Sequence, residues 1–189
     1  VGTFVGYYGL MDMGVSSAVT RYVSRSFGQR DDGEANRIVS TAFALFSVVA
    51  VLVLGITAAV SALSFVVVRD PAEYRVVRVV LLVLGVRVAL SFPARVFAGV
   101  LNAHLRHDLT SAATIAQLLV ANAAIYAHLG AGGGAVGMGL ILLGAAAVEY
   151  LLNLASVLRV FPQLRLSRAD VRRQSLKDIF QYSWKTLAA

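Results

Sequence analysis

The chain has 189 residues, of which 58% are hydrophobic and only 14% are charged, and its mean hydropathy is +0.75. Soluble domains carry about 25% charged residues, so this composition excludes an ordinary soluble domain and predicts an integral membrane protein. Cysteine is absent, which excludes disulfides, thiolate metal sites and thiol nucleophiles. Because the sequence opens in the middle of an apolar pattern without an initiator methionine, we expect it to be part of a longer protein.

Five apolar stretches are each long enough to cross a membrane as a helix, which takes roughly 20 residues. We therefore expect an all-α polytopic transmembrane bundle, with a further helix that begins at about residue 179. The expected spans are about 1–23, 38–68, 76–101, 109–129 and 135–158. In the charged linker 25–37, Asp31 or Asp32 is suited to cap a short surface helix, and Gly130 to Gly134 is expected to form a turn between two spans.

The 17 lysine and arginine residues predict an orientation. If the first span ends in the cytoplasm, most of these residues lie in cytoplasmic segments, whereas Arg69, Arg75 and Arg78 lie outside. This asymmetry follows the positive-inside rule and accounts for the net charge of +7 without nucleic acid binding. The last basic segment also suits the anionic headgroups of membrane lipids.

Polar side chains inside the first span form one stripe. Tyr8, Asp12, Ser16 and Thr20 are four residues apart and therefore share one face of a helix. A carboxylate in mid-membrane costs about 2.5 to 3.5 kcal/mol on insertion scales, so it normally faces protein or water. We predict that Asp12, Ser16 and Thr20 line a substrate cavity; the alternative is that the stripe faces a neighbouring helix.

Two arginines and one glutamate lie within or near the ends of later spans. Arg87 is inside the third span, and a guanidinium suits bidentate binding of phosphate. We predict that Arg87 lines the cavity; the alternative is an ion pair with Asp12 or Glu149. Arg95 is a second candidate for the cavity, although its place near the inner boundary also suits an anchor. Glu149 in the fifth span is either a cavity residue or a structural partner.

Other chemistry has little support in the sequence. His104 and His107, three residues apart and next to Asp108, can share one face, but no further strong ligand is nearby, so we predict no metal site. The glycine run lacks the following Lys-Ser/Thr of a phosphate-binding loop. Gln117 and His128 share one face of the fourth span and suit a buried polar contact or a polar path. We predict no catalytic residue and no cofactor.

Two segments resemble the polysaccharide flippases of the multidrug/oligosaccharidyl-lipid/polysaccharide exporter superfamily. The run GLMDMGVSSAVTRYVSR is similar to the second membrane helix of that family, with matches at Asp12, Gly14, Ala18 and Arg21. The run PARVFAGVLNAHLRHDL is similar to the family's fourth helix and the turn after it, with matches at Pro93, Gly99, Leu101, Arg106 and Asp108. His107 departs from the pattern, since an aromatic residue is commoner there. The resemblance covers nearly the whole chain, from the family's second helix to the start of its seventh.

The resemblance implies a transporter of twelve or more helices in two pseudo-symmetric bundles. Such a protein moves a lipid-linked oligosaccharide across the inner (cytoplasmic) membrane by alternating access. On this reading residues 1–189 are part of the N-terminal bundle, and the missing second half of the same chain supplies the rest of the cavity. A drug/cation antiporter of the same superfamily is the runner-up. A membrane-embedded enzyme of polysaccharide assembly is a further alternative, but the outer loops are short and plain for an active site.

Overall fold

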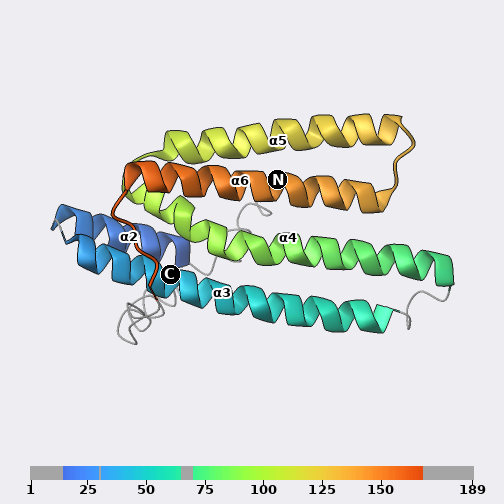
Figure 1. Cartoon of the computed structure of the whole chain (residues 1–189), viewed down its shortest axis with the longest axis horizontal. Helices are drawn as coiled ribbons and strands as arrows, with labels where there is room; N and C mark the ends of the chain where they lie inside the picture. The colour runs from blue at the N-terminus through green and yellow to red at the C-terminus, as the bar shows by residue number, and fades with distance from the viewer. Residues whose placement is uncertain (1–14, 30, 65–69, 168–189) are drawn as a thin grey trace, which may run out of the picture. The chain divides into compact units, whose positions relative to one another are not determined.

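The computed structural model describes residues 15–29, 31–64 and 70–167. Within these ranges the protein is all-helical and contains five helices (Figure 1). They are α2 (Val15–Gly28), α3 (Asp32–Leu63), α4 (Pro71–Ala103), α5 (His107–Gly130) and α6 (Ala135–Val160). The all-α expectation is thus confirmed for the described residues, and four of the helices, α3 to α6, are long and apolar enough to cross a membrane.

The expected count of five spans plus the start of a sixth is not confirmed in the described part of the chain. Of the first expected span the structure describes α2, which has 14 residues and continues to Gly28, beyond the expected end at residue 23. The helix expected from residue 179 lies outside the described residues. The span expected at 38–68 is α3, which begins earlier, at Asp32, and ends at Leu63.

The early start of α3 has a local cause. The Asp31 carboxylate accepts a hydrogen bond from the backbone N–H of Glu34 at 2.8 Å, which is the geometry of a helix N-cap. Asp32 and Glu34 place negative charge in the first turn, where the helix dipole favours it. The expectation of a separate short helix in the linker 25–37 is wrong, because Asp31 caps the long helix itself and α2 occupies the chain up to Gly28.

The other helix ends depend on prolines and on tight turns, and the sequence indicates only some of them. Pro71 is the first residue of α4, where the missing N–H of proline does no harm, whereas Pro93 lies inside α4 without ending it. The helices α4 and α5 both end in a Schellman motif. In the first, Arg106 N–H donates to Leu101 O at 2.9 Å and Leu105 N–H to Asn102 O at 3.0 Å. In the second, Gly133 N–H donates to His128 O at 2.8 Å and Gly132 N–H to Leu129 O at 2.9 Å.

The chain forms two compact units, and four of the helices, α3 to α6, contribute to both. The first unit contains α2, α3 up to Phe46, the stretch Arg95–Thr110 and the described chain from Ala155 onward. Its core consists of large side chains with almost no exposed surface: Val19, Val23, Val39, Val96, Phe97, Val100, Leu101 and Val157. The Phe43 and Phe97 rings pack with centroids 5.8 Å apart. This unit is therefore held by apolar side-chain packing.

The second unit contains Ser47–Ala94 and Ser111–Leu154 and is built differently. The side chains that it buries are small or polar: Ser61, Ser64, Ala89, Ala113, Gln117, Ala121, Ala145 and Asn153. The helices approach closely at glycines, since a Cβ added to Gly85 would lie 2.2 Å from Thr57 Cγ2 and one added to Gly139 would lie 3.3 Å from Val83 Cγ1. Close approach at small residues is typical of helix packing in membranes.

Candidate functional site

Arg87 lies at the midpoint of α4, one of the helices that is apolar enough to span a membrane. Its side chain is partly buried, and the buried Nε has no hydrogen-bond partner among the residues that the structure describes. With a rise of about 1.5 Å per residue, the Cα of Arg87 is roughly 24 Å from either helix end, too far for the side chain to reach the helix ends. The guanidinium is therefore placed within the span with donor capacity unused.

Glu149 on α6 is satisfied by a neighbouring helix. The Thr114 hydroxyl on α5 donates a hydrogen bond of 2.7 Å to Oε1 of Glu149. Within the described part of the chain, Glu149 forms no ion pair with Arg87. An ion pair with Glu149 is one of the two structural alternatives for Arg87. This contact fits the role of structural partner, which is the alternative to a cavity role for Glu149. The other carboxylate oxygen can still accept a hydrogen bond from a further donor.

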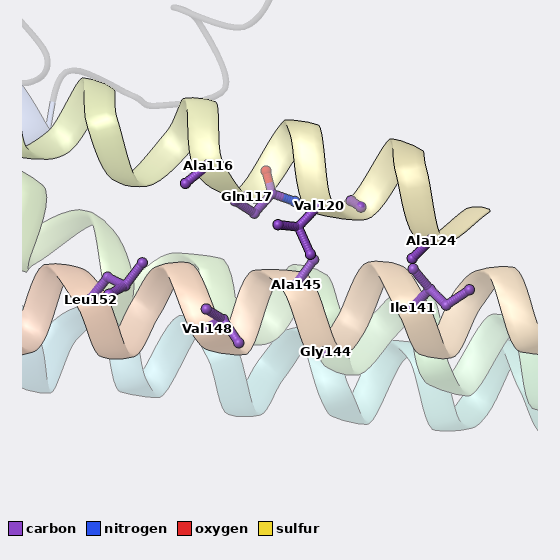
Figure 2. A pocket seen from close by; sticks show the side chains of 10 residues that line it. Ala116, Gln117, Val120, Ala124, Ile141, Gly144, Ala145, Val148 and Leu152 are labelled. Atoms are coloured by element: carbon purple, nitrogen blue, oxygen red, sulfur yellow. The ribbon is translucent and has the colours of Figure 1, made fainter. Parts of the chain in front are cut away.

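An apolar groove of about 290 Å³ lies between α5 and α6 in the second unit (Figure 2). Small residues, among them Ala121, Gly144 and Ala145, line it together with aliphatic side chains such as Val148. Gln117, which is buried, is its one polar lining residue. The groove therefore favours an aliphatic occupant and offers almost no polar recognition.

His128, which shares a face of α5 with Gln117, has a different environment. Its Nε2 lies 3.1 Å from Gly134 O, so the imidazole donates to the main chain at the start of α6. A Cβ added at Gly133 or Gly137 would lie within 2.2 Å of the His128 ring, so these glycines make room for it. The side chain secures the α5–α6 turn, which is a structural role.

Thr20 belongs to a seam between α2 and α4 in the first unit. Its hydroxyl donates to Gly99 O at 3.3 Å, and the Ser24 hydroxyl one turn later donates to Ala103 O at the same distance. Both pairs are spaced by four residues, so one face of α2 lies along one face of α4. For Thr20 this is the neighbouring-helix arrangement, and its assignment to a cavity stays a prediction.

The remaining predicted site residues lie in different places. Asp12 is outside the described residues, and so is the side chain of Ser16, whose backbone belongs to α2. Arg95 belongs to the first unit and is partly buried, with an interaction of its own. Arg87 and Glu149 belong to the second unit. The described residues thus do not by themselves bring the six predicted side chains together.

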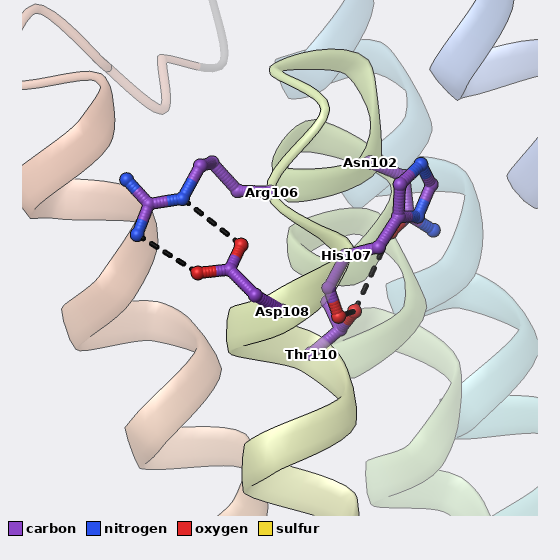
Figure 3. Close-up of polar contacts among 5 residues, drawn as sticks. All are labelled: Asn102, Arg106, His107, Asp108 and Thr110. Carbon is purple, nitrogen blue, oxygen red and sulfur yellow. Dashed lines mark hydrogen bonds and ion pairs between the residues drawn. The ribbon is translucent and has the colours of Figure 1, made fainter.

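The turn between α4 and α5 carries an exposed ion pair between Arg106 and Asp108 (Figure 3). Arg106 Nε and Nη2 donate to the two carboxylate oxygens of Asp108 at 3.0 and 3.1 Å, a bidentate geometry. Donation to Asp108 raises the pKa of the Arg106 guanidinium above its ordinary value. Thr110 donates to His107 O at 3.0 Å and lies 3.5 Å from the Asn102 side-chain oxygen. These contacts fix the turn, so the matched residues Arg106 and Asp108 have a structural use.

The chain matches no known family model, no curated protein and no solved structure.

Sequence reasoning did not identify the environments of three groups that the structure singles out. Thr114 is the partner of Glu149, Asn153 has a buried Oδ1 without a hydrogen-bond partner in the described ranges, and Asn36 and Ser40 bind the main chain after α6. Asn36 and Ser40 did carry a signal. They are polar residues spaced by four at the edge of an apolar run, the same pattern that drew attention to the stripe containing Asp12.

Proposed function

We propose that this chain is part of a membrane transporter that moves a lipid-linked oligosaccharide across the inner (cytoplasmic) membrane by alternating access. The observation that carries the proposal is the Arg87 guanidinium at the middle of an apolar span, with a buried Nε that has no partner among the described residues. A charge there costs about 2.5 to 3.5 kcal/mol on insertion scales, so it is retained for a compensating interaction. A planar guanidinium suits the pyrophosphate that links a glycan to its lipid carrier.

Two further features support a transporter over an enzyme. The four long apolar helices bury polar side chains between them in the second unit, whereas the turn 131–134 between α5 and α6 is short and rich in glycine. The resemblance of the segments around Asp12 and Pro93 to flippase helices points the same way. The flippase family, the inner membrane and the lipid-linked glycan remain parts of this proposal.

The runner-up is a drug/cation antiporter, which the hydrogen-bonded carboxylate of Glu149 within α6 favours. A cationic substrate would be attracted by carboxylates, whereas an anionic pyrophosphate would be attracted by Arg87. Substitution of the two residues therefore separates the candidates.

The test is complementation in the full-length protein. In a strain that lacks its own flippase, Arg87→Ala should be present in the membrane at normal levels but fail to restore surface polysaccharide. Arg87→Lys should recover little, because an ammonium cannot form the bidentate contact. Arg78→Ala is the matched control, since Arg78 is exposed near the start of the same helix. Full activity of Arg87→Ala would refute the proposal, and export of a cationic drug that depends on Glu149 alone would favour the antiporter.

A further inference from the structure

The segment that follows α6, residues 161–167, is anchored at its first residue. Phe161 is buried, and its ring packs against Phe27 of α2 and His104 after α4, with centroids 5.1 and 5.8 Å away. Phe161 N–H still donates to Val157 O at 2.7 Å, and Leu164 N–H closes a turn onto Phe161 O at 3.1 Å. The start of the segment is thus fixed by a buried aromatic ring and by two backbone hydrogen bonds.

The rest of the segment is held by two side chains of α3. Asn36 Nδ2 donates to Gln163 O at 3.0 Å, and Arg165 N–H donates to Asn36 Oδ1 at 2.8 Å. One turn later, Ser40 donates to Arg165 O and accepts from Ser167 N–H, both at 3.2 Å. The bound groups belong to alternate residues, 163, 165 and 167, which is the period of an extended strand. Asn36 and Ser40 therefore bind main chain as the edge of a sheet does, and we name this pair the backbone clasp.

The clasp binds a stretch of chain whose own side chains are little buried. Beyond Phe161 no side chain of the segment is buried, and Pro162, Gln163, Arg165 and Leu166 are exposed. The backbone groups of residues 163–167 need partners, and water is an acceptable substitute for the clasp because the stretch lies at the surface. The buried ring of Phe161 has no such substitute.

We propose that residues 163–167 form a releasable latch, closed on α3 by the backbone clasp of Asn36 and Ser40, with Phe161 as the fixed pivot. Because the clasp binds only main-chain groups, its grip does not depend on the side chains of residues 163, 165 and 167. When it opens, the segment swings away from α3 while the end of α6 stays in place. The latch does not depend on the proposed transport.

Hydrogen exchange of the full chain in lipid nanodiscs, read at single amides, tests the latch. In Asn36→Ala/Ser40→Ala the amides of Arg165 and Ser167 should exchange about tenfold faster, the change expected from the loss of two or more exposed hydrogen bonds. The amide of Leu164 should be unchanged, because it bonds to Phe161 O. Trypsin cleavage after Arg165 should accelerate by a similar factor, with cleavage after Arg159 in α6 unchanged.

Two variants provide matched controls. Asn122 and Ser91 donate only within their own helices, to Leu118 O and Val88 O, both at 2.7 Å. Asn122→Ala and Ser91→Ala should leave exchange and cleavage in 163–167 unchanged. The latch is refuted if the double variant leaves the Arg165 and Ser167 amides as protected as before. It is equally refuted if Leu164 and the Arg159 site change together with them, since that would indicate general unfolding without a pivot.

Discussion

The two units bury opposite kinds of side chain. The first unit encloses Phe97, Leu101 and several valines with almost no exposed surface. The second encloses serine, glutamine, asparagine and alanine, and turns aliphatic side chains such as Val51, Leu119 and Val120 outward, each about two thirds exposed. Exposed apolar surface on this scale requires a covering. The difference indicates that the first unit is stabilised by its own packing, whereas the second needs lipid or other helices around it.

The largest expected contrast between the units is the side of the membrane from which a labelling reagent can reach their turns. The arginine distribution predicts that the first unit's turns are cytoplasmic and that the α5–α6 turn of the second is outside. In the cysteine-free chain, Gln29→Cys and His107→Cys should react with an impermeant maleimide only from the cytoplasm. Ala131→Cys should react only from outside; it is preferred to Gly132, whose φ of 78° disfavours other residues. Labelling of Ala131→Cys only from the cytoplasm would reverse the orientation.

A large truncation in each unit should have very different costs. Phe97→Ala removes a ring that is 1% exposed and packs on Phe43, so it should lower the free energy of unfolding by about 3 to 5 kcal/mol. Leu119→Ala removes a side chain that is 68% exposed, and it should change this free energy by about 0.5 kcal/mol or less. Equilibrium unfolding in mixed micelles measures both. Equal costs would contradict the comparison.

The second unit should instead be sensitive at its glycines. Gly85→Ala places a methyl group against Thr57 and forces α3 and α4 apart, which should cost about 1 to 3 kcal/mol in the same unfolding assay. Thr57→Gly, which removes the opposing atoms, should recover part of the loss when the two changes are combined. Gly55→Ala is the control, since nothing lies within 4 Å of its added Cβ. A neutral Gly85→Ala would argue against close helix packing here.

The smallest contrast is between the two Schellman turns. Both hold a residue at positive φ, but the first unit uses Leu105, at 57° and 81% exposed, where the second uses Gly132, at 78°. A side chain in this conformation costs about 1 kcal/mol. Leu105→Gly should therefore raise the free energy of unfolding by about 1 kcal/mol, and Gly132→Ala should lower it by a similar amount. Changes of the same sign in a thermal unfolding series would show that the backbone does not decide stability at these turns.

These turns also show how far the sequence could be interpreted. The glycine run from Gly130 to Gly134 predicted the turn before α6. The residues around Leu105, in contrast, do not indicate that its backbone adopts a left-handed conformation. Four spans were recognisable because each long apolar run is preceded by a charged or helix-breaking residue. These residues are Asp31, Pro71, Arg106 and Gly134. Their boundaries shifted where a cap or a charged first turn extended a helix past its apolar part.

Contacts between helices could not be predicted from the sequence, and the reason is physical. The spacing of Asn36 and Ser40 is visible, but their partners lie 125 to 129 residues later and are main-chain groups, which no side-chain pattern reveals. The choice of Thr114 as the partner of Glu149 likewise depends on the register of α5 against α6. Arg87 stood out from sequence alone, because an isolated charge in a long apolar run is conspicuous wherever its helix packs.

The most direct test of the account is whether Arg87 recognises an anionic lipid carrier. Native mass spectrometry of the full-length protein in nanodiscs compares binding of a polyprenyl pyrophosphate with that of the uncharged polyprenol. The unsubstituted protein and the Arg78→Gln control should prefer the pyrophosphate by about tenfold or more, the factor expected from hydrogen bonds to a charged group. Arg87→Gln should lose this preference while it still binds the polyprenol. If Arg87→Gln keeps the full preference for the pyrophosphate, the central claim is wrong.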